Sequence, residues 1–86
     1  MVNDTIYLLG SHRKARRFLD FIGERGFVTD KHEKGARRHI WYDIVDGGHQ
    51  GFVDINRNRV HAYADLHLQD VVKEYQDMVA QGAALK

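Results

Sequence analysis

The chain has 86 residues, no cysteine, 43% hydrophobic residues and a formal net charge of +1. These values predict one domain over residues 1–86 with one modest core, and they exclude disulfides and thiolate metal sites. The N-terminal MVNDTIYLLG lacks the pattern of a signal peptide, and no stretch reaches the roughly 18 apolar residues of a membrane span, so we expect a cytoplasmic protein without membrane contact.

The first part of the chain predicts a strand and then a helix. Thr5 to Leu9 is a short apolar run, which is typical of a strand buried on both faces. Ser11 is the expected N-cap of a helix over residues 12–25, and Gly26 is its expected stop. The core stripe of this helix repeats at helical spacing and consists of Ala15, Phe18, Leu19 and Ile22.

The middle of the chain predicts an antiparallel meander. Residues 27–29 form either a short strand or the anchor of a loop, and residues 30–38 (DKHEKGARR) form either a mobile loop or the distal end of a long hairpin. Further strands are expected over residues 38–45, 52–55 and 60–63, with turns at residues 46–48 and 56–58. Alternation along the first of them places His39, Trp41 and Asp43 on one side and Ile40, Tyr42 and Ile44 on the other.

The last helix carries the clearest amphipathic stripe. Asp65 is its expected N-cap, Gly82 its expected end, and residues 83–86 are expected to fray. The stripe consists of Leu68, Val71, Val72, Tyr75, Met78 and Val79. The predicted fold is therefore α+β, a two-layer structure of order β-α-β-β-β-α with a mostly antiparallel sheet of three to five strands and both helices on one face.

Positive charge marks the start of the first helix. The four cations there, which we call the helix-start cations, are Arg13, Lys14, Arg16 and Arg17. A helix N-terminus already has partial positive charge, so each cation in the first turn costs about 0.3–1 kcal/mol when poorly screened. A bound anion would compensate for this cost. The alternatives are that these side chains extend into water or that Asp20 pairs with Arg16 and Arg17.

The charges are segregated along the chain. Residues 1–38 hold nine Lys/Arg against five Asp/Glu, residues 39–59 hold two against three, and residues 60–86 hold two against four. This pattern predicts one cationic and one anionic face. Further contact residues are expected at Arg37, Arg38, Arg57 and Arg59. Trp41 is either a base-stacking platform beside them or a core residue.

Catalytic and metal-binding motifs are missing from the sequence. The six histidines show no HExxH motif and no close ligand spacing, and there is no P-loop or nucleophile motif. Asp43 and Asp54, on neighbouring strands, either bind a divalent ion or share a proton, or else form the solvated side of the sheet. We expect no metal and no cofactor, and an enzyme is the less favoured class.

The stretch GFVTDKHEKGARRHIWYDIVDGG, about a quarter of the chain, resembles HicA-type toxins. These are small RNA-cleaving proteins with a core of helix, three strands and helix like that of double-stranded-RNA-binding domains. The resemblance implies that His39 is a catalytic histidine, a general acid or base at the ribose 2′-hydroxyl. The chain departs from that family in its additional N-terminal strand, the Arg-Arg before the histidine and the acidic last helix, so no family is assigned.

Three functions follow from these observations. The leading prediction is a small, non-enzymatic regulatory module whose basic helix start contacts an anionic partner, with nucleic acid and an acidic protein surface ranked almost level. The second is an inhibitor or adaptor that binds a larger protein complex. The third is a HicA-like ribonuclease centred on His39. A homodimer is a further prediction, because the N-terminal strand or residues 60–63 would lie at a sheet edge that can recruit a second copy.

Overall fold

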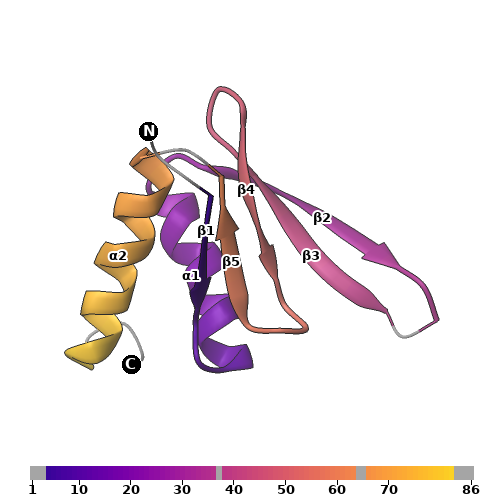
Figure 1. The fold of residues 1–86 in the computed structure, drawn as a ribbon, viewed down its shortest axis with the longest axis horizontal. Helices are drawn as coiled ribbons and strands as arrows, with labels where there is room; N and C mark the ends of the chain where they lie inside the picture. Colours follow the sequence, from indigo (N-terminus) through magenta and orange to yellow (C-terminus); the bar gives the residue numbers. More distant parts are fainter. Residues whose placement is uncertain (1–3, 37, 64–65, 83–86) are drawn as a thin grey trace.

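A five-stranded antiparallel sheet and two helices make up the fold. The computed structural model describes residues 4–36, 38–63 and 66–82. Along the chain the elements are β1 (Thr5–Leu8), α1 (His12–Glu24), β2 (Val28–Lys34), β3 (His39–Val45), β4 (His49–Asp54), β5 (Arg59–Ala62) and α2 (Leu66–Ala80). The sheet order is β1-β5-β4-β3-β2, and both helices pack on one side of it (Figure 1). The predicted α+β two-layer class is therefore confirmed.

Both predicted helical stripes form the core. Ala15, Phe18 and Ile22 of α1 are fully buried. They pack with the buried side chains of α2 and of one sheet face, namely Leu68, Val72, Tyr75, Ile44, Val53, Val60 and Ala62. Within the described ranges, no helix is long and apolar enough to cross a membrane.

The start of α1 is tied down on two sides. Ser11 caps the helix as predicted, because its Oγ accepts a hydrogen bond from the Lys14 backbone N–H at 3.1 Å. The Tyr75 hydroxyl of α2 donates to the Lys14 carbonyl oxygen at 2.7 Å. Burial raises the pKa of Tyr75 above its ordinary value, which keeps this donor protonated. The predicted cap Asp65 and the predicted frayed residues 83–86 lie outside the described residues.

The two edge strands differ from expectation. The prediction that the first strand is buried on both faces is wrong, because Ile6 is 51% exposed and Leu8 is 72% exposed. β1 is an edge strand, and the helices cover only one of its faces. Of the two candidate sheet edges, β1 is the one observed, since β5 lies between β1 and β4. The homodimer remains a prediction.

The polar segment after residue 29 is the distal end of a long hairpin, one of its two predicted states. β2 pairs with β3 from Val28 opposite Val45 to Lys34 opposite His39. This hairpin reaches away from the helices (Figure 1), so its distal half meets water on both sides. The HicA resemblance implies a core of helix, three strands and helix. β5 is an additional strand between the two helices, so it is a further departure from that family.

Candidate functional site

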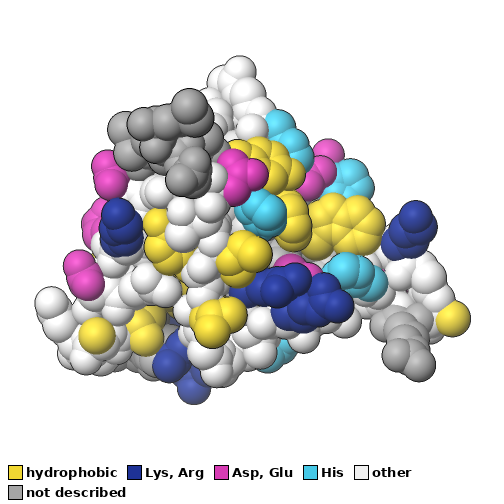
Figure 2. Space-filling model, in the orientation of Figure 1, with side chains coloured by type: hydrophobic (Ala, Val, Ile, Leu, Met, Phe, Trp, Pro, Cys, Tyr) yellow, Lys and Arg dark blue, Asp and Glu magenta, His cyan; other side chains and the backbone are white. Residues whose placement is uncertain are grey.

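The sheet face that points away from the helices carries most of the chemically interesting side chains. The cross-strand register aligns them in two rows: Asp30, Asp43, Phe52, His61 and Ile6 in one, and His32, Trp41, Asp54, Arg59 and Leu8 in the other. We call this surface, together with the neighbouring Lys34, His39, His49 and Tyr63, the open face. Figure 2 shows hydrophobic and histidine side chains gathered there, with cations beside them.

Aromatic rings dominate the centre of the open face. Trp41 is half-buried, and the His32 ring stacks on it with centroids 5.2 Å apart and planes 14° from parallel. The centroid of the Phe52 ring lies 5.2 Å from that of His61 and 6.3 Å from that of Tyr63. The prediction that Trp41 shares a strand face with His39 is confirmed, and the alternative that Trp41 belongs to the core is wrong.

The rings of Trp41, Phe52 and Tyr63 border a hollow of about 330 Å³. Its lining consists of Lys34, His39, Trp41, Asp43, Phe52 and Tyr63. The pKa of Tyr63 is raised, first by burial and then by the negative charges of Asp43 and Asp4. The phenol therefore stays protonated at neutral pH and can donate a hydrogen bond into the hollow. The hollow therefore provides aromatic rings for stacking, one cation, one carboxylate and one imidazole.

Two histidines lie within ion-pair distance of Asp43. Its Oδ2 lies 2.7 Å from His32 Nε2, and its Oδ1 lies 3.2 Å from His49 Nε2. The carboxylate is 25% exposed, so it remains open to a ligand in the hollow. The three side chains come from β2, β3 and β4, which places the contact beyond the reach of any local sequence motif.

Asp54 forms a second, more deeply buried pair with His39. The Asp54 side chain is 3% exposed, and its Oδ1 lies 3.2 Å from His39 Nε2. The same oxygen accepts a hydrogen bond from the Arg57 backbone N–H at 3.2 Å, and Arg57 Nη1 lies 3.9 Å from Oδ2. A buried carboxylate thus orients a histidine that is itself 47% exposed.

The two aspartates that the sequence placed on neighbouring strands do share the open face. Asp43 lies opposite Phe52 and Asp54 lies opposite Trp41, so the two aspartates are diagonal neighbours across β3 and β4. Each carboxylate pairs with histidine instead of with the other. Among the described residues, no group of three or more His, Asp or Glu side chains is arranged to hold a metal ion.

The helix-start cations lie in the helix layer, on the other side of the sheet from Trp41. Arg13, Arg16 and Arg17 are exposed, whereas Lys14 is half-buried beside the end of β1. In the described part of the chain none of the four pairs with a carboxylate, so the predicted alternative pairing with Asp20 is not observed. Arg16 Nε instead donates to His12 Nε2 at 3.0 Å.

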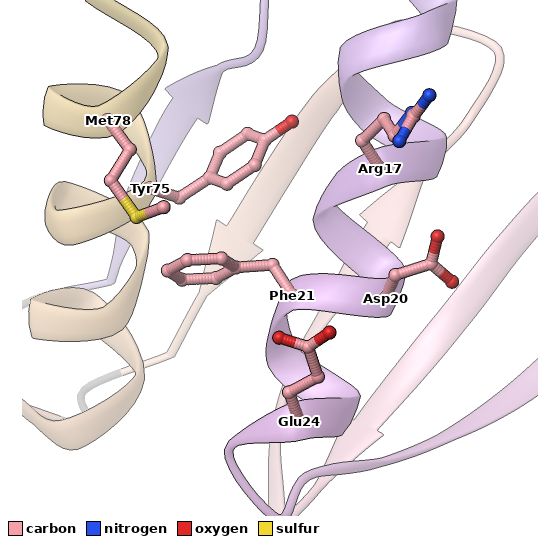
Figure 3. Close-up of a pocket in the computed structure, with 6 residues that line it drawn as sticks. All are labelled: Arg17, Asp20, Phe21, Glu24, Tyr75 and Met78. Carbon is pink, nitrogen blue, oxygen red and sulfur yellow. The ribbon is translucent and has the colours of Figure 1, made fainter. Parts of the chain in front are cut away.

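Arg17 also borders a second hollow, of about 260 Å³, between the two helices (Figure 3). Its lining is Arg17, Asp20, Phe21, Glu24, Tyr75 and Met78. The charged groups stand on α1, and the apolar groups face one another from both helices. This hollow offers opposite charges close together and no set of groups suited to one ligand class.

The predicted contact residues do not form one patch. Leu9 N–H donates to the Asn58 carbonyl at 2.7 Å, which brings the turn carrying Arg57 next to the start of α1. Arg59 follows on the open face. Arg38 lies apart, at the tip of the β2–β3 hairpin, where its Nε is 2.8 Å from Glu33 Oε1. Arg37 lies outside the described residues.

Several residues of the open face are absent from the sequence-based prediction. They are Lys34, Phe52 and Tyr63, which complete the hollow, and His32 and His49, which lie beside Asp43. The sequence does contain a signal for Phe52, because period-2 alternation places Phe52 and Asp54 on the same side of their strand. Their approach to Trp41 depends on the register between strands, which includes an irregularity at Ile44/Val45.

Comparison of the chain with models of known protein families, with curated proteins and with solved structures found no match. The functional inference therefore comes from the geometry of the open face and the cations around it.

Proposed function

We propose that this protein is a small regulatory module that binds single-stranded nucleic acid on its open face. The observation that carries this proposal is the hollow lined by Trp41, Phe52 and Tyr63 beside the exposed cation Lys34. Aromatic rings on a sheet stack unpaired bases, and flanking cations hold the phosphates. Bases in a duplex are already stacked on one another, which makes a single strand the better fit.

The charges around the hollow support the same partner. Asp43 and Asp54 each lie beside a histidine, with the nearest Nε2–Oδ distances at 2.7 and 3.2 Å. Arg59 and Arg57 lie at the end of the face where the β4–β5 turn meets the start of α1. A strand that runs past this end reaches the helix-start cations, which are a second proposed contact for the backbone. An acidic protein surface would use these cations but not the aromatic hollow.

Anisotropy titrations with labelled single-stranded RNA, single-stranded DNA and duplex DNA of equal length test this proposal. We expect both single strands to bind more tightly than the duplex. For a strand short enough to occupy the open face alone, contacts from Lys34, Arg57 and Arg59 to three phosphates predict a slope of log affinity against log salt near −2, at about −0.7 per phosphate. A longer strand that also reaches the helix-start cations should give a steeper slope. Arg38→Ala, at the hairpin tip, is the matched control and should leave the slope unchanged. If no nucleic acid binds at low salt, the proposal is wrong.

A second candidate function is RNA cleavage at His39, and the buried Asp54 behind it favours this candidate. In that step His39 takes the proton of a ribose 2′-hydroxyl while the 2′-oxygen attacks the adjacent phosphorus. The phosphorus–O5′ bond breaks, solvent supplies a proton to the leaving oxygen, and a 2′,3′-cyclic phosphate remains. Asp54 positions the ring and stabilises its protonated form.

Incubation of single-stranded RNA and DNA with the protein separates the two functions. Under the second candidate, RNA is cleaved, DNA is not, and His39→Ala lowers the cleavage rate by about 10²–10⁴-fold. His12→Ala, which changes an exposed histidine on α1, serves as the control and should retain the rate. Intact RNA with the wild-type protein would eliminate cleavage and leave the binding proposal standing.

A further inference from the structure

The hollow on the open face contains a carboxylate, which needs an explanation if the ligand is an anion. Asp43 lines the hollow beside Trp41, Phe52 and Tyr63. An ionised carboxylate only accepts hydrogen bonds, so the part of a ligand that lies against it must donate them. A phosphate is repelled at this position. The group that reaches Asp43 is therefore the edge of a base.

Asp43 has two histidines within ion-pair distance and still has acceptor capacity. His32 Nε2 lies 2.7 Å from Oδ2, and His49 Nε2 lies 3.2 Å from Oδ1. A carboxylate offers about four lone-pair sites, so each oxygen retains room for a further donor. Two adjacent donors on one ligand would use both oxygens at once, in the bidentate arrangement that gives the strongest recognition.

We propose that the hollow selects guanine, with Asp43 as the residue that determines specificity. This inference rests on the proposed function. Guanine presents an N1–H and a 2-amino group side by side. Adenine and cytosine present one amino group next to a ring acceptor, and uracil presents one N–H between two carbonyls. Each of these three places an acceptor against the Asp43 carboxylate, where it is repelled.

The other groups of the hollow match the rest of a guanine nucleotide. Trp41 and Phe52 provide ring faces for stacking. The protonated Tyr63 hydroxyl is a donor for the carbonyl oxygen that guanine carries next to N1. Lys34 supplies the positive charge for the phosphate. An arginine side chain of a protein partner also presents paired donors, but Lys34 repels it.

The fluorescence of Trp41, the single tryptophan of the chain, reports occupancy of the hollow. We would titrate the wild-type protein with GMP, IMP, AMP, CMP, UMP and N-acetylarginine amide. GMP should bind at least about tenfold more tightly than AMP, CMP and UMP. IMP, which keeps N1–H but lacks the 2-amino group, should fall between them.

Asp43→Asn removes one of the two acceptors with little change of shape and should abolish the preference for GMP. Asp70→Asn is the matched control, because Asp70 is an exposed aspartate of α2 and lies outside the hollow. Circular dichroism would confirm that both variants are folded.

Three outcomes would overturn this inference: equal or absent binding of all the nucleotides, a GMP preference that survives in Asp43→Asn, or a response to N-acetylarginine amide alone. In the first two cases the binding of single strands in the anisotropy assay would still support the proposed function. Absence of single-strand binding in that assay would instead be a failure of the proposed function itself.

Discussion

Replacing Gly51 with alanine should destabilise the protein by about 3 kcal/mol, close to the limit that a domain of this size tolerates. A Cβ at this position would lie 2.2 Å from the His61 carbonyl oxygen and 3.1 Å from both Ala62 Cα and Leu68 Cδ2. The first two atoms belong to the backbone of β5, which is paired on both sides and cannot move aside. The third belongs to a fully buried side chain of α2.

Gly23→Ala is the matched control, because it adds the same methyl group where nothing lies within 4 Å. Gly23 stands inside α1, and alanine is a better helix former than glycine by about 0.5–1 kcal/mol, so this variant should be more stable than the wild type. Urea denaturation followed by circular dichroism measures both changes. Equal stability of Gly51→Ala and the wild type would mean that β5 and α2 do not approach Gly51 as closely as described.

The helices were predictable because their signals are local. The Ser11 cap and the repeat of Ala15, Phe18 and Ile22 lie within one segment, and each is confirmed. The predicted stripe of α2 is confirmed for the same reason. Helical spacing indicates which side chains share a face, and both stripes pack against the sheet and against each other.

The strands were harder to predict, because burial in a sheet depends on what covers each face. Ile6 and Leu8 look like core residues in the sequence, but β1 is an edge strand whose outer face is uncovered. β2 shows the opposite difference, because its sequence is polar and yet it forms a regular strand. Its polar residues show no alternation because the hairpin extends past the helices, and β2 pairs with β3 over its whole length.

The candidate site could be predicted only in part, since it combines one local and one long-range relationship. Period-2 alternation put His39 and Trp41 on the same side of one strand, which is correct. The pairing of His39 with Asp54 and the approach of Phe52 to Trp41 depend on the register of β3 against β4. Turn chemistry at residues 46–48 indicates a hairpin there, but the register shift between Ile44 and Val45 decides which side chains meet.

The charged groups of the helix start and of the open face have different partners. The helix-start cations project from the helix layer without carboxylate partners among the described residues, whereas the aspartates of the open face are matched with histidines. A ligand that uses both surfaces must pass the end where Asn58 contacts Leu9. This arrangement favours an extended, flexible anion over a compact one.

Trp41→Ala should weaken the binding of single-stranded RNA by about ten- to a hundredfold. Stacking of one base on an aromatic ring contributes roughly 1–3 kcal/mol, and each 1.4 kcal/mol corresponds to a tenfold change in affinity. Trp41 lies at the centre of the open face and lines the hollow, so its removal takes away the largest stacking surface there. Anisotropy titrations at one fixed salt concentration measure the loss.

Two further variants distinguish stacking from a general loss of structure. Trp41→Phe keeps an aromatic ring and should retain most of the affinity. Ile6→Ala truncates an exposed apolar residue of the same face that lies outside the hollow, and its affinity should match the wild type. Because Trp41 is not part of the buried core, Trp41→Ala should still unfold cooperatively. A folded Trp41→Ala protein with wild-type affinity would show that RNA does not stack on the open face, and the basic surface at the start of α1 would then be the remaining contact.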